Sequence, residues 1–148
     1  MYNDFIGVSY KTETDPSKSI NYKLLKELFE NKKNLKFLIL QKTLNENEKG
    51  FFSNFDNVHF INDLDSSLLF KNTFDIVSSV KYMITIDTAI GHISGYLSKK
   101  SFLLLQRPSA FYWGFKSKRT TDYKNHHLLR QPKPGDWVSV INNLINLI

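Results

Sequence analysis

Apolar residues follow two different spacings along this chain. Five short segments are rich in consecutive apolar residues, a pattern that predicts β-strands, several of them buried on both faces. These segments are Asp4–Ser9, Leu35–Gln41, Val58–Ile61, Tyr82–Ile86 and Ser101–Leu105.

Between these segments, apolar residues recur every three or four positions, which predicts helices. The first helix carries Ile20, Leu24, Leu25, Leu28 and Phe29 on one face and ends near Asn31. The other predicted helices are Glu46–Phe55, a helix capped by Asp65 or Ser66 that runs to about Ser79, Ala89–Leu97, and a last helix capped by Asp136. The stretch from Gln106 to Gln131 is predicted to be rich in loops.

Strands and helices therefore alternate, with short connections. This order predicts a parallel sheet covered by helices on both faces, a three-layer α/β sandwich of the Rossmann-like, doubly wound kind. Neither an internal repeat nor a low-complexity linker divides the chain, so residues 1–148 are expected to form a single domain.

Composition narrows the class of protein. The chain is 41% hydrophobic, which is typical of a folded globule, and no apolar stretch approaches the roughly 18 residues of a membrane span. There are no cysteines, so disulfides and thiolate metal sites are excluded and a reducing cytoplasm is expected. Lysine and arginine number 20 against 14 acidic residues, and this excess favours an anionic ligand.

The candidate chemistry lies in "TIDTAIGH", where a predicted strand meets a predicted helix. Backbone N–H groups at a helix start carry partial positive charge and bind phosphate oxygens. Thr88 adds a hydroxyl donor, and Ala89 and Gly91 are expected to let a ligand approach the backbone. His92 lies one turn into the helix and would lean back toward its start. The alternative is that Asp87 or Thr88 is only a helix cap and His92 a packed side chain.

A second group of donors follows the first predicted strand. "SYKTETDPSKSI" contains Lys11, Thr12, Lys18 and Ser19, and it leaves the sheet at the same edge as Asp87. A lysine at that edge can neutralise a diphosphate as a point charge. The alternative is that Ser17 or Ser19 caps the next helix and that both lysines are solvated.

The sequence resembles the donor-binding half of heptosyltransferase-like glycosyltransferases with the GT-B fold. The resemblance is to family 9 of these enzymes, in the version that follows tetratricopeptide repeats in bacterial proteins. It is carried by "TIDTAIGHISGYLSKKSFLLL", "KSI", "FYWGF" and "LLRQPKPGDW" and covers nearly the whole chain.

The resemblance implies that the chain binds a nucleotide sugar and serves an inverting glycosyl transfer without a tightly bound metal or another cofactor. It implies that Asp87, Thr88, Ala89 and His92 hold the diphosphate and that Lys18 meets it from the first loop. Gln41 would lie near the base or ribose.

Three departures from the family pattern affect this prediction. Ser98-Lys99-Lys100 replaces a Gly-x-Pro turn, so the turn after the His92 helix is expected to be built differently. Lys11-Thr12 replaces a Ser-Gly pair. No segment is left for an acceptor domain, and no general base can be assigned. The acidic residues Asp4, Glu13, Asp15 and Asp122 are expected at the surface.

Two other functions stay open at this point. One is a non-catalytic remnant of the fold that binds a nucleotide or a partner protein. The other is a single-stranded nucleic-acid binder that uses the aromatic and basic residues between Phe111 and Arg119, although such aromatics more often pack a loop onto a core. A metal site at His126-His127 is disfavoured, because no matching carboxylate or cysteine follows the required spacing.

Overall fold

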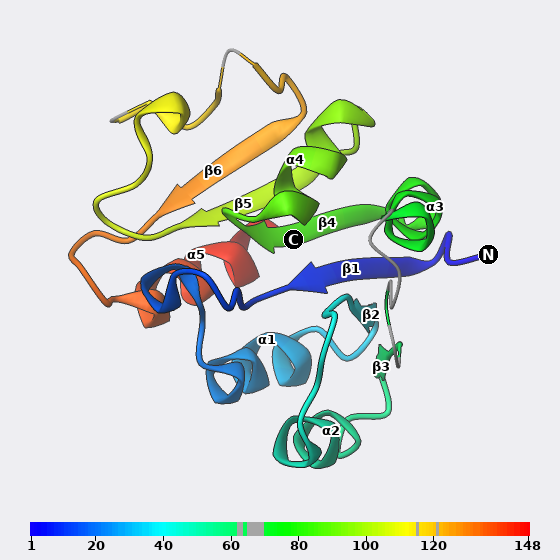
Figure 1. The fold of residues 1–148 in the computed structure, drawn as a ribbon. Helices are drawn as coiled ribbons and strands as arrows, with labels where there is room; N and C mark the ends of the chain where they lie inside the picture. Colours follow the sequence, from blue (N-terminus) through cyan, green and yellow to red (C-terminus); the bar gives the residue numbers. More distant parts are fainter. Residues whose placement is uncertain (62–63, 65–69, 115, 121) are drawn as a thin grey trace.

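Six parallel strands form one sheet in the order β3-β2-β1-β4-β5-β6 (Figure 1). The computed structural model describes residues 1–61, 64, 70–114, 116–120 and 122–148. The strands are β1 (Phe5–Ser9), β2 (Lys36–Ile39), β3 (Val58–Phe60), β4 (Tyr82–Ile86), β5 (Ser101–Leu105) and β6 (His126–Arg130).

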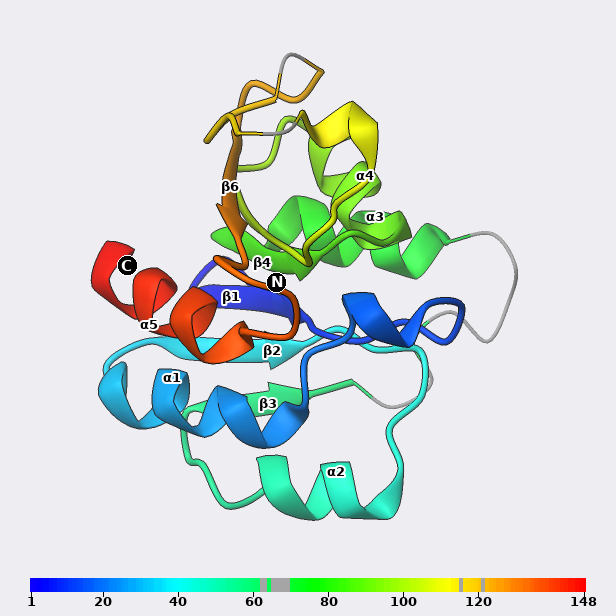
Figure 2. The ribbon, with the colours of Figure 1, turned by 90° about the vertical axis from the view of Figure 1, so that its left-hand side faces the viewer.

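Helices cover both faces of the sheet (Figure 2). The helices α1 (Leu25–Asn31), α2 (Glu46–Phe52) and α5 (Trp137–Leu147) pack against one face, where their buried residues share a core with Ile6, Ile84 and Leu104. The helices α3 (Lys71–Ser79) and α4 (Ala89–Tyr96) pack against the other face, around Leu38 and Met83. The three-layer, doubly wound α/β prediction is confirmed.

Most element boundaries agree with the sequence to within a few residues. Asp136 caps α5 as predicted, since its carboxylate accepts a hydrogen bond of 3.1 Å from the Ser139 N–H. The predicted cap at Asp65 or Ser66 lies outside the described residues, and α3 is described from Lys71 to Ser79. None of the helices in the described part of the chain has the length and apolar character that spanning a membrane requires.

The stretch Gln106–Gln131 is rich in loops, as predicted, but it also contains a strand that the prediction missed. The segment contains β6, which pairs in parallel with β5 from Ser101–His126 to Leu105–Arg130, and a short 3-10 helix, η3 (Phe111–Trp113). The strand has only two consecutive apolar residues, Leu128 and Leu129, so it gives a weak hydrophobic signal. A strand at the edge of a sheet has one neighbour and needs less apolar surface than a central strand.

The turn after α4 keeps a left-handed residue although it lacks glycine. Ser98 has φ +52°, its N–H donates to the Gly95 carbonyl, and the Lys99 N–H donates to the Ser94 carbonyl. This is a Schellman motif, so the expectation that the turn would be built differently is wrong. The Lys99 ammonium adds a contact of its own, because it donates to the carbonyls of Ser78 and Val80 at the end of α3.

The left-handed serine predicts a stabilising substitution. Ser98→Gly should raise the free energy of unfolding by about 0.5 kcal/mol, because glycine adopts this φ without steric cost but loses more chain entropy on folding. Urea unfolding measures the change. Ser78→Gly, within α3, serves as the control and should lower stability by about 0.5 kcal/mol.

Candidate functional site

The strand order reverses between β1 and β4. The connection after β1 leads to α1 on one face of the sheet, whereas α4 follows β4 on the other face. The loops leaving β1 and β4 therefore diverge and open a crevice beyond the carboxyl ends of these strands, where doubly wound proteins bind their ligands. The predicted site residues lie at this crevice.

Asp87 directly follows β4, and its carboxylate joins three segments of the chain. Its side chain is 2% exposed and lies 2.9 Å from the Lys18 Nζ. The Tyr112 hydroxyl donates to the same carboxylate at 3.3 Å, and the His92 Nε2 is 3.9 Å from it. The structure thus brings Lys18 and Tyr112, both far from Asp87 in the sequence, to the carboxylate that lies five residues before His92.

Lys18 is held in place by a short 3-10 helix, η1 (Pro16–Lys18). The Asp15 carboxylate caps this helix by accepting from the Ser17 N–H at 3.0 Å. The hydrogen bond with Asp87 raises the pKa of Lys18 above its ordinary value and outweighs the opposing effect of burial. The lysine is therefore a fixed, protonated cation at the edge of the crevice.

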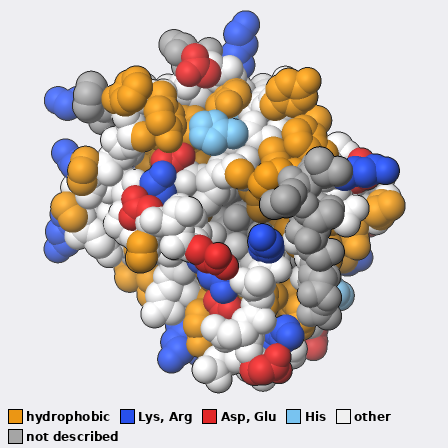
Figure 3. Space-filling view, in the orientation of Figure 1, with side chains coloured by type: hydrophobic (Ala, Val, Ile, Leu, Met, Phe, Trp, Pro, Cys, Tyr) orange, Lys and Arg blue, Asp and Glu red, His pale blue; other side chains and the backbone are white. Residues whose placement is uncertain are grey.

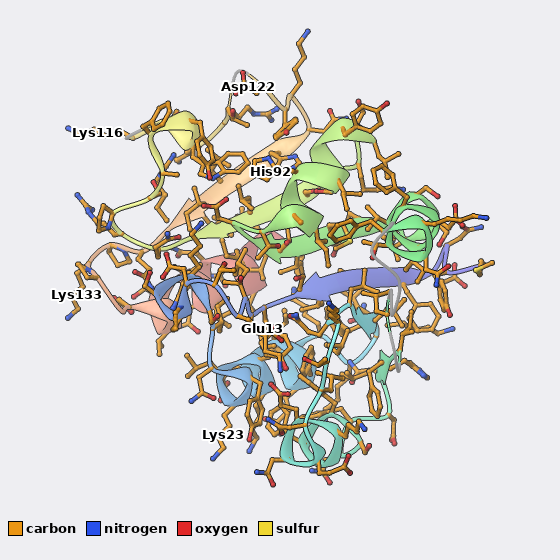
Figure 4. The ribbon with its side chains drawn as sticks, viewed as in Figure 1. Glu13, Lys23, His92, Lys116, Asp122 and Lys133 are labelled. Carbon is orange, nitrogen blue, oxygen red and sulfur yellow. The ribbon has the colours of Figure 1, made fainter. Side chains whose placement is uncertain are left out.

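His92 lies within a group of aromatic rings on α4 and the loop after β5. Its Nδ1 is 3.1 Å from the Tyr123 hydroxyl, and its ring stacks on Trp113 with centroids 5.3 Å apart. Trp113 also stacks on His126, with centroids 6.2 Å apart. The side chain of His92 is 44% exposed, and Figures 3 and 4 show it at the surface among hydrophobic side chains. The ring is oriented by its neighbours and accessible from solvent.

A cavity of about 270 Å³ opens at the start of α4, and its lining includes Thr12, Gln41, Thr88 and Ala89. Thr88 occupies the N-cap position, but its side chain makes no capping hydrogen bond. The hydroxyl oxygen of Thr88 is buried and has no partner among the described residues. An unpartnered hydroxyl beside a helix N-terminus suits an anionic ligand.

Gln41 and Lys11 line the same cavity but are already engaged with the protein. The Gln41 Oε1 accepts from the N–H groups of Tyr10 and Lys11, and its Nε2 donates to the Lys11 carbonyl. The Lys11 Nζ forms an ion pair of 2.7 Å with Glu48. In this state Gln41 fixes the first loop, and Lys11 is not a free cation. Sequence reasoning missed Glu48, whose only signal was its place three residues after Asn45 in a capping box.

The expected role of Gly91 is wrong. Gly91 is buried against the sheet, and a Cβ there would lie 3.1 Å from the Ile86 carbonyl oxygen. Gly91 therefore allows α4 to pack closely on β4 and β5, and it is not among the residues that line the cavity. Ala89, at the first position of the helix, is exposed and lines the cavity as expected.

The structure also places the other residues that the sequence singled out. Asp4, Glu13 and Asp122 are exposed, as predicted, and Asp15 caps η1. Trp113 is 1% exposed and cannot stack on a nucleic-acid base, so the nucleic-acid alternative loses its central aromatic residue. No group of three potential metal ligands is found within the described ranges. Tyr112, which the sequence marked only as part of "FYWGF" and of the nucleic-acid alternative, contacts Asp87, and Tyr123, which it did not mark, contacts His92.

Comparison with known proteins rests on solved structures, because no family model and no curated protein matches the chain. The E. coli heptosyltransferase WaaC with ADP matches at 16% identity and a TM-score of 0.74, over 98% of this chain and 44% of that chain. WaaC with ADP-2-deoxy-2-fluoro heptose matches at 13% identity and a TM-score of 0.70, over 99% of this chain and 44% of that chain. This chain has a heptosyltransferase-like GT-B fold.

A third structure with this GT-B fold, the E. coli ADP-heptose lps heptosyltransferase II, matches at 12% identity and a TM-score of 0.54. The match covers 98% of this chain and 47% of that chain. The chain thus spans less than half the length of the structures that it matches, and it corresponds to one half of a GT-B molecule.

Proposed function

We propose that this chain binds the diphosphate of a nucleotide sugar and acts as the donor-binding half of a glycosyltransferase. The observation that carries the proposal is the meeting of Lys18, Asp87 and His92 beside the start of α4, at the reversal of the strand order. Two of the structures with the same fold were determined with ADP or an ADP-sugar analogue, which supports the choice of ligand.

The residues have distinct roles in this proposal. The first N–H groups of α4 and the Thr88 hydroxyl donate to phosphate oxygens, with Ala89 and Thr12 beside them. Asp87 orients the Lys18 ammonium and the His92 imidazole toward the same ligand. As the sugar leaves, negative charge grows on the diphosphate, and these donors stabilise it without rearranging.

A second domain or a partner chain completes the transfer in this proposal. It would supply the sugar acceptor and the general base, since the acidic side chains that the structure describes are exposed, cap helices or are paired with lysines. The use of a nucleotide sugar and the lack of cysteine fit a cytoplasmic location.

Titration with nucleotides tests the proposal. Calorimetry of the full chain with ADP, GDP, UDP and their sugars should detect binding of at least one of them. Lys18→Gln should weaken that binding about tenfold and reduce its dependence on salt, because a direct cation–phosphate contact is lost. Lys23→Gln removes the same charge from an exposed position away from His92 (Figure 4) and should leave binding unchanged.

A non-catalytic module is the second candidate, and one observation favours it. Lys11 and Gln41, which line the cavity, already have partners within the protein. The Gln41 Oε1 accepts from the Lys11 N–H, and the Lys11 ammonium is paired with Glu48. If no nucleotide binds at concentrations up to the millimolar range, the donor-binding proposal is wrong and this second candidate replaces it.

A further inference from the structure

A second cavity, distinct from the one at the start of α4, lies beyond the carboxyl ends of β5 and β6. It measures about 210 Å³, and its lining includes Gln106, Arg107, Ser109, Lys116, Arg130 and Gln131. Nothing in the function proposed above uses these residues. Its volume suits a single small ring with its substituents rather than a nucleotide.

Two buried amide side chains line this cavity with unused hydrogen-bonding capacity. Gln131 is 1% exposed and Gln106 is 8% exposed. The Gln131 Nε2 and the Gln106 Oε1 are both buried and have no partner within the described ranges. Buried polar atoms without partners are uncommon and costly, and a ligand that supplied one acceptor and one donor would satisfy both.

Gln131 is held rigidly while its amide nitrogen stays free. Its Oε1 accepts from the Arg107 N–H at 3.1 Å and from the Gly135 N–H at 3.0 Å. The side chain therefore ties the loop after β5 to the turn after β6. This arrangement fixes the orientation of the amide, so the Nε2 donor is positioned before any ligand arrives.

The electrostatic character of the cavity is positive. Arg107, Lys116 and Arg130 line it, and none of the described lining residues is acidic. Arg130 donates to the Ser109 hydroxyl at 2.6 Å and to the Trp113 carbonyl. These hydrogen bonds hold its positively charged guanidinium in place at the side of the cavity. Arg107 gives one N–H to the Pro132 carbonyl at 3.0 Å, and its other guanidinium donors have no hydrogen bond to the described residues. Lys116 is exposed and is labelled in Figure 4.

We propose that this cavity binds the acidic group of a sugar that carries a carboxylate or a phosphate. The cations match its charge, the Gln131 Nε2 donates to one of its oxygens, and the Gln106 Oε1 accepts from one of its hydroxyl groups. An apolar or neutral ligand would leave the cations without a partner.

The position of the cavity links it to the proposed transfer, and the acceptor role stated here rests on that proposed function. The loop after β5 that lines the cavity with Arg107 and Ser109 also carries Tyr112, whose hydroxyl donates to Asp87. A sugar acid in this cavity is therefore bound by the same loop that contacts the diphosphate site. In a glycosyltransferase, that place suits an acidic sugar of the acceptor.

The test is an amide-resolved NMR titration of the full chain with glucuronate, glucose 6-phosphate, glucose and inorganic phosphate. Glucuronate or glucose 6-phosphate should shift the side-chain amide signals of Gln106 and Gln131 and the Arg107 N–H signal, and the comparison of the two separates carboxylate from phosphate. Glucose alone should shift them far less. Equal shifts with inorganic phosphate alone, or no shift with either acidic sugar, would overturn the proposal.

Three variants and a matched control sharpen the result. Arg107→Gln and Lys116→Gln should each weaken binding of the acidic sugar about threefold, the effect of losing one solvent-exposed charge contact. Lys133→Gln removes an exposed charge from the nearby turn without touching the cavity and should have no effect. Gln131→Leu removes the donor itself, and circular dichroism shows whether that variant folds.

The outcome is separable from that of the nucleotide titration. Binding of a nucleotide without binding of either acidic sugar would refute this inference and leave the donor site standing. Binding of an acidic sugar without any nucleotide would refute the proposed function and leave the cavity as a saccharide site of its own.

Discussion

Glu48→Ala should lower the free energy of unfolding by about 3 kcal/mol, among the largest losses expected for a single side chain here. The Glu48 carboxylate accepts from the Tyr10 hydroxyl at 2.7 Å, from the Lys11 ammonium and from the Asn45 N–H. Tyr10 is 1% exposed, so its hydroxyl would be left buried without an acceptor. Urea unfolding at neutral pH measures the loss.

The matched control is Glu46→Ala in the same helix. The Glu46 side chain is 90% exposed, and among the described residues it pairs only with Lys49. Its removal should change the free energy of unfolding by less than about 0.5 kcal/mol. Equal losses from the two variants would show that the contacts of Glu48 contribute nothing beyond those of a surface carboxylate.

Glu48 also predicts a dependence of stability on pH. Burial favours the protonated form, but the hydrogen bonds from Lys11, Asn45 and Tyr10 outweigh it and lower the pKa of Glu48 below its ordinary value. A depressed folded-state pKa contributes stability above the unfolded-state pKa, and this contribution is lost as pH falls through the folded-state value. Between about pH 6 and about pH 3, the protein should therefore lose more stability than its Glu48→Gln variant.

Asp87→Ala should weaken nucleotide binding about tenfold and lower the free energy of unfolding by about 2 kcal/mol. The substitution removes the shared partner of Lys18 and Tyr112 and leaves the lysine without an orienting acceptor. The stability loss is moderate because the Lys18 side chain is 23% exposed and water can solvate its ammonium. Calorimetric titration and urea unfolding measure the two effects.

Asp75→Ala is the control for this second prediction, since Asp75 is exposed on α3. Asp87→Asn separates charge from hydrogen bonding, because the amide keeps an acceptor for Lys18 but removes the charge. The hydrogen bond with Asp87 is the main cause of the raised pKa of Lys18, so that pKa should fall in Asp87→Ala. Nucleotide binding that survives Asp87→Ala unchanged would contradict the proposed role of this carboxylate.

The fold could be predicted because its central strands are continuously apolar. Tyr82–Ile86 and Ser101–Leu105 are buried along their whole length, and only a parallel sheet covered on both faces buries strands in this way. The edge strand His126–Arg130 was missed for the opposite reason. This strand is buried because it pairs with β5 and because the loop after β5 packs against it. The spacing of apolar residues within the strand does not contain that information.

The sequence predicted which residues meet at the carboxyl edge of the sheet. It did not predict which side chains pair with one another there. Parallel strands place Asp87 and the first loop at one edge, so the proximity of Lys18 followed from topology. The partners of Lys11 and Gln41 come from α2 and from the first loop itself, and no spacing rule connects these segments. The left-handed Ser98 was likewise hidden, because the hydrogen bonds of the turn compensate for the strain of a serine there.

The stacking of Trp113 on His92 and on His126 gives the protein a built-in optical probe. Indole emission is sensitive to a stacked imidazole, so any ligand that moves the His92 ring should change the emission of Trp113. The chain has one other tryptophan, Trp137, which lies in α5 on the far face of the sheet and supplies a constant background. A Trp137→Phe variant would isolate the signal and report occupancy of the crevice without an added label.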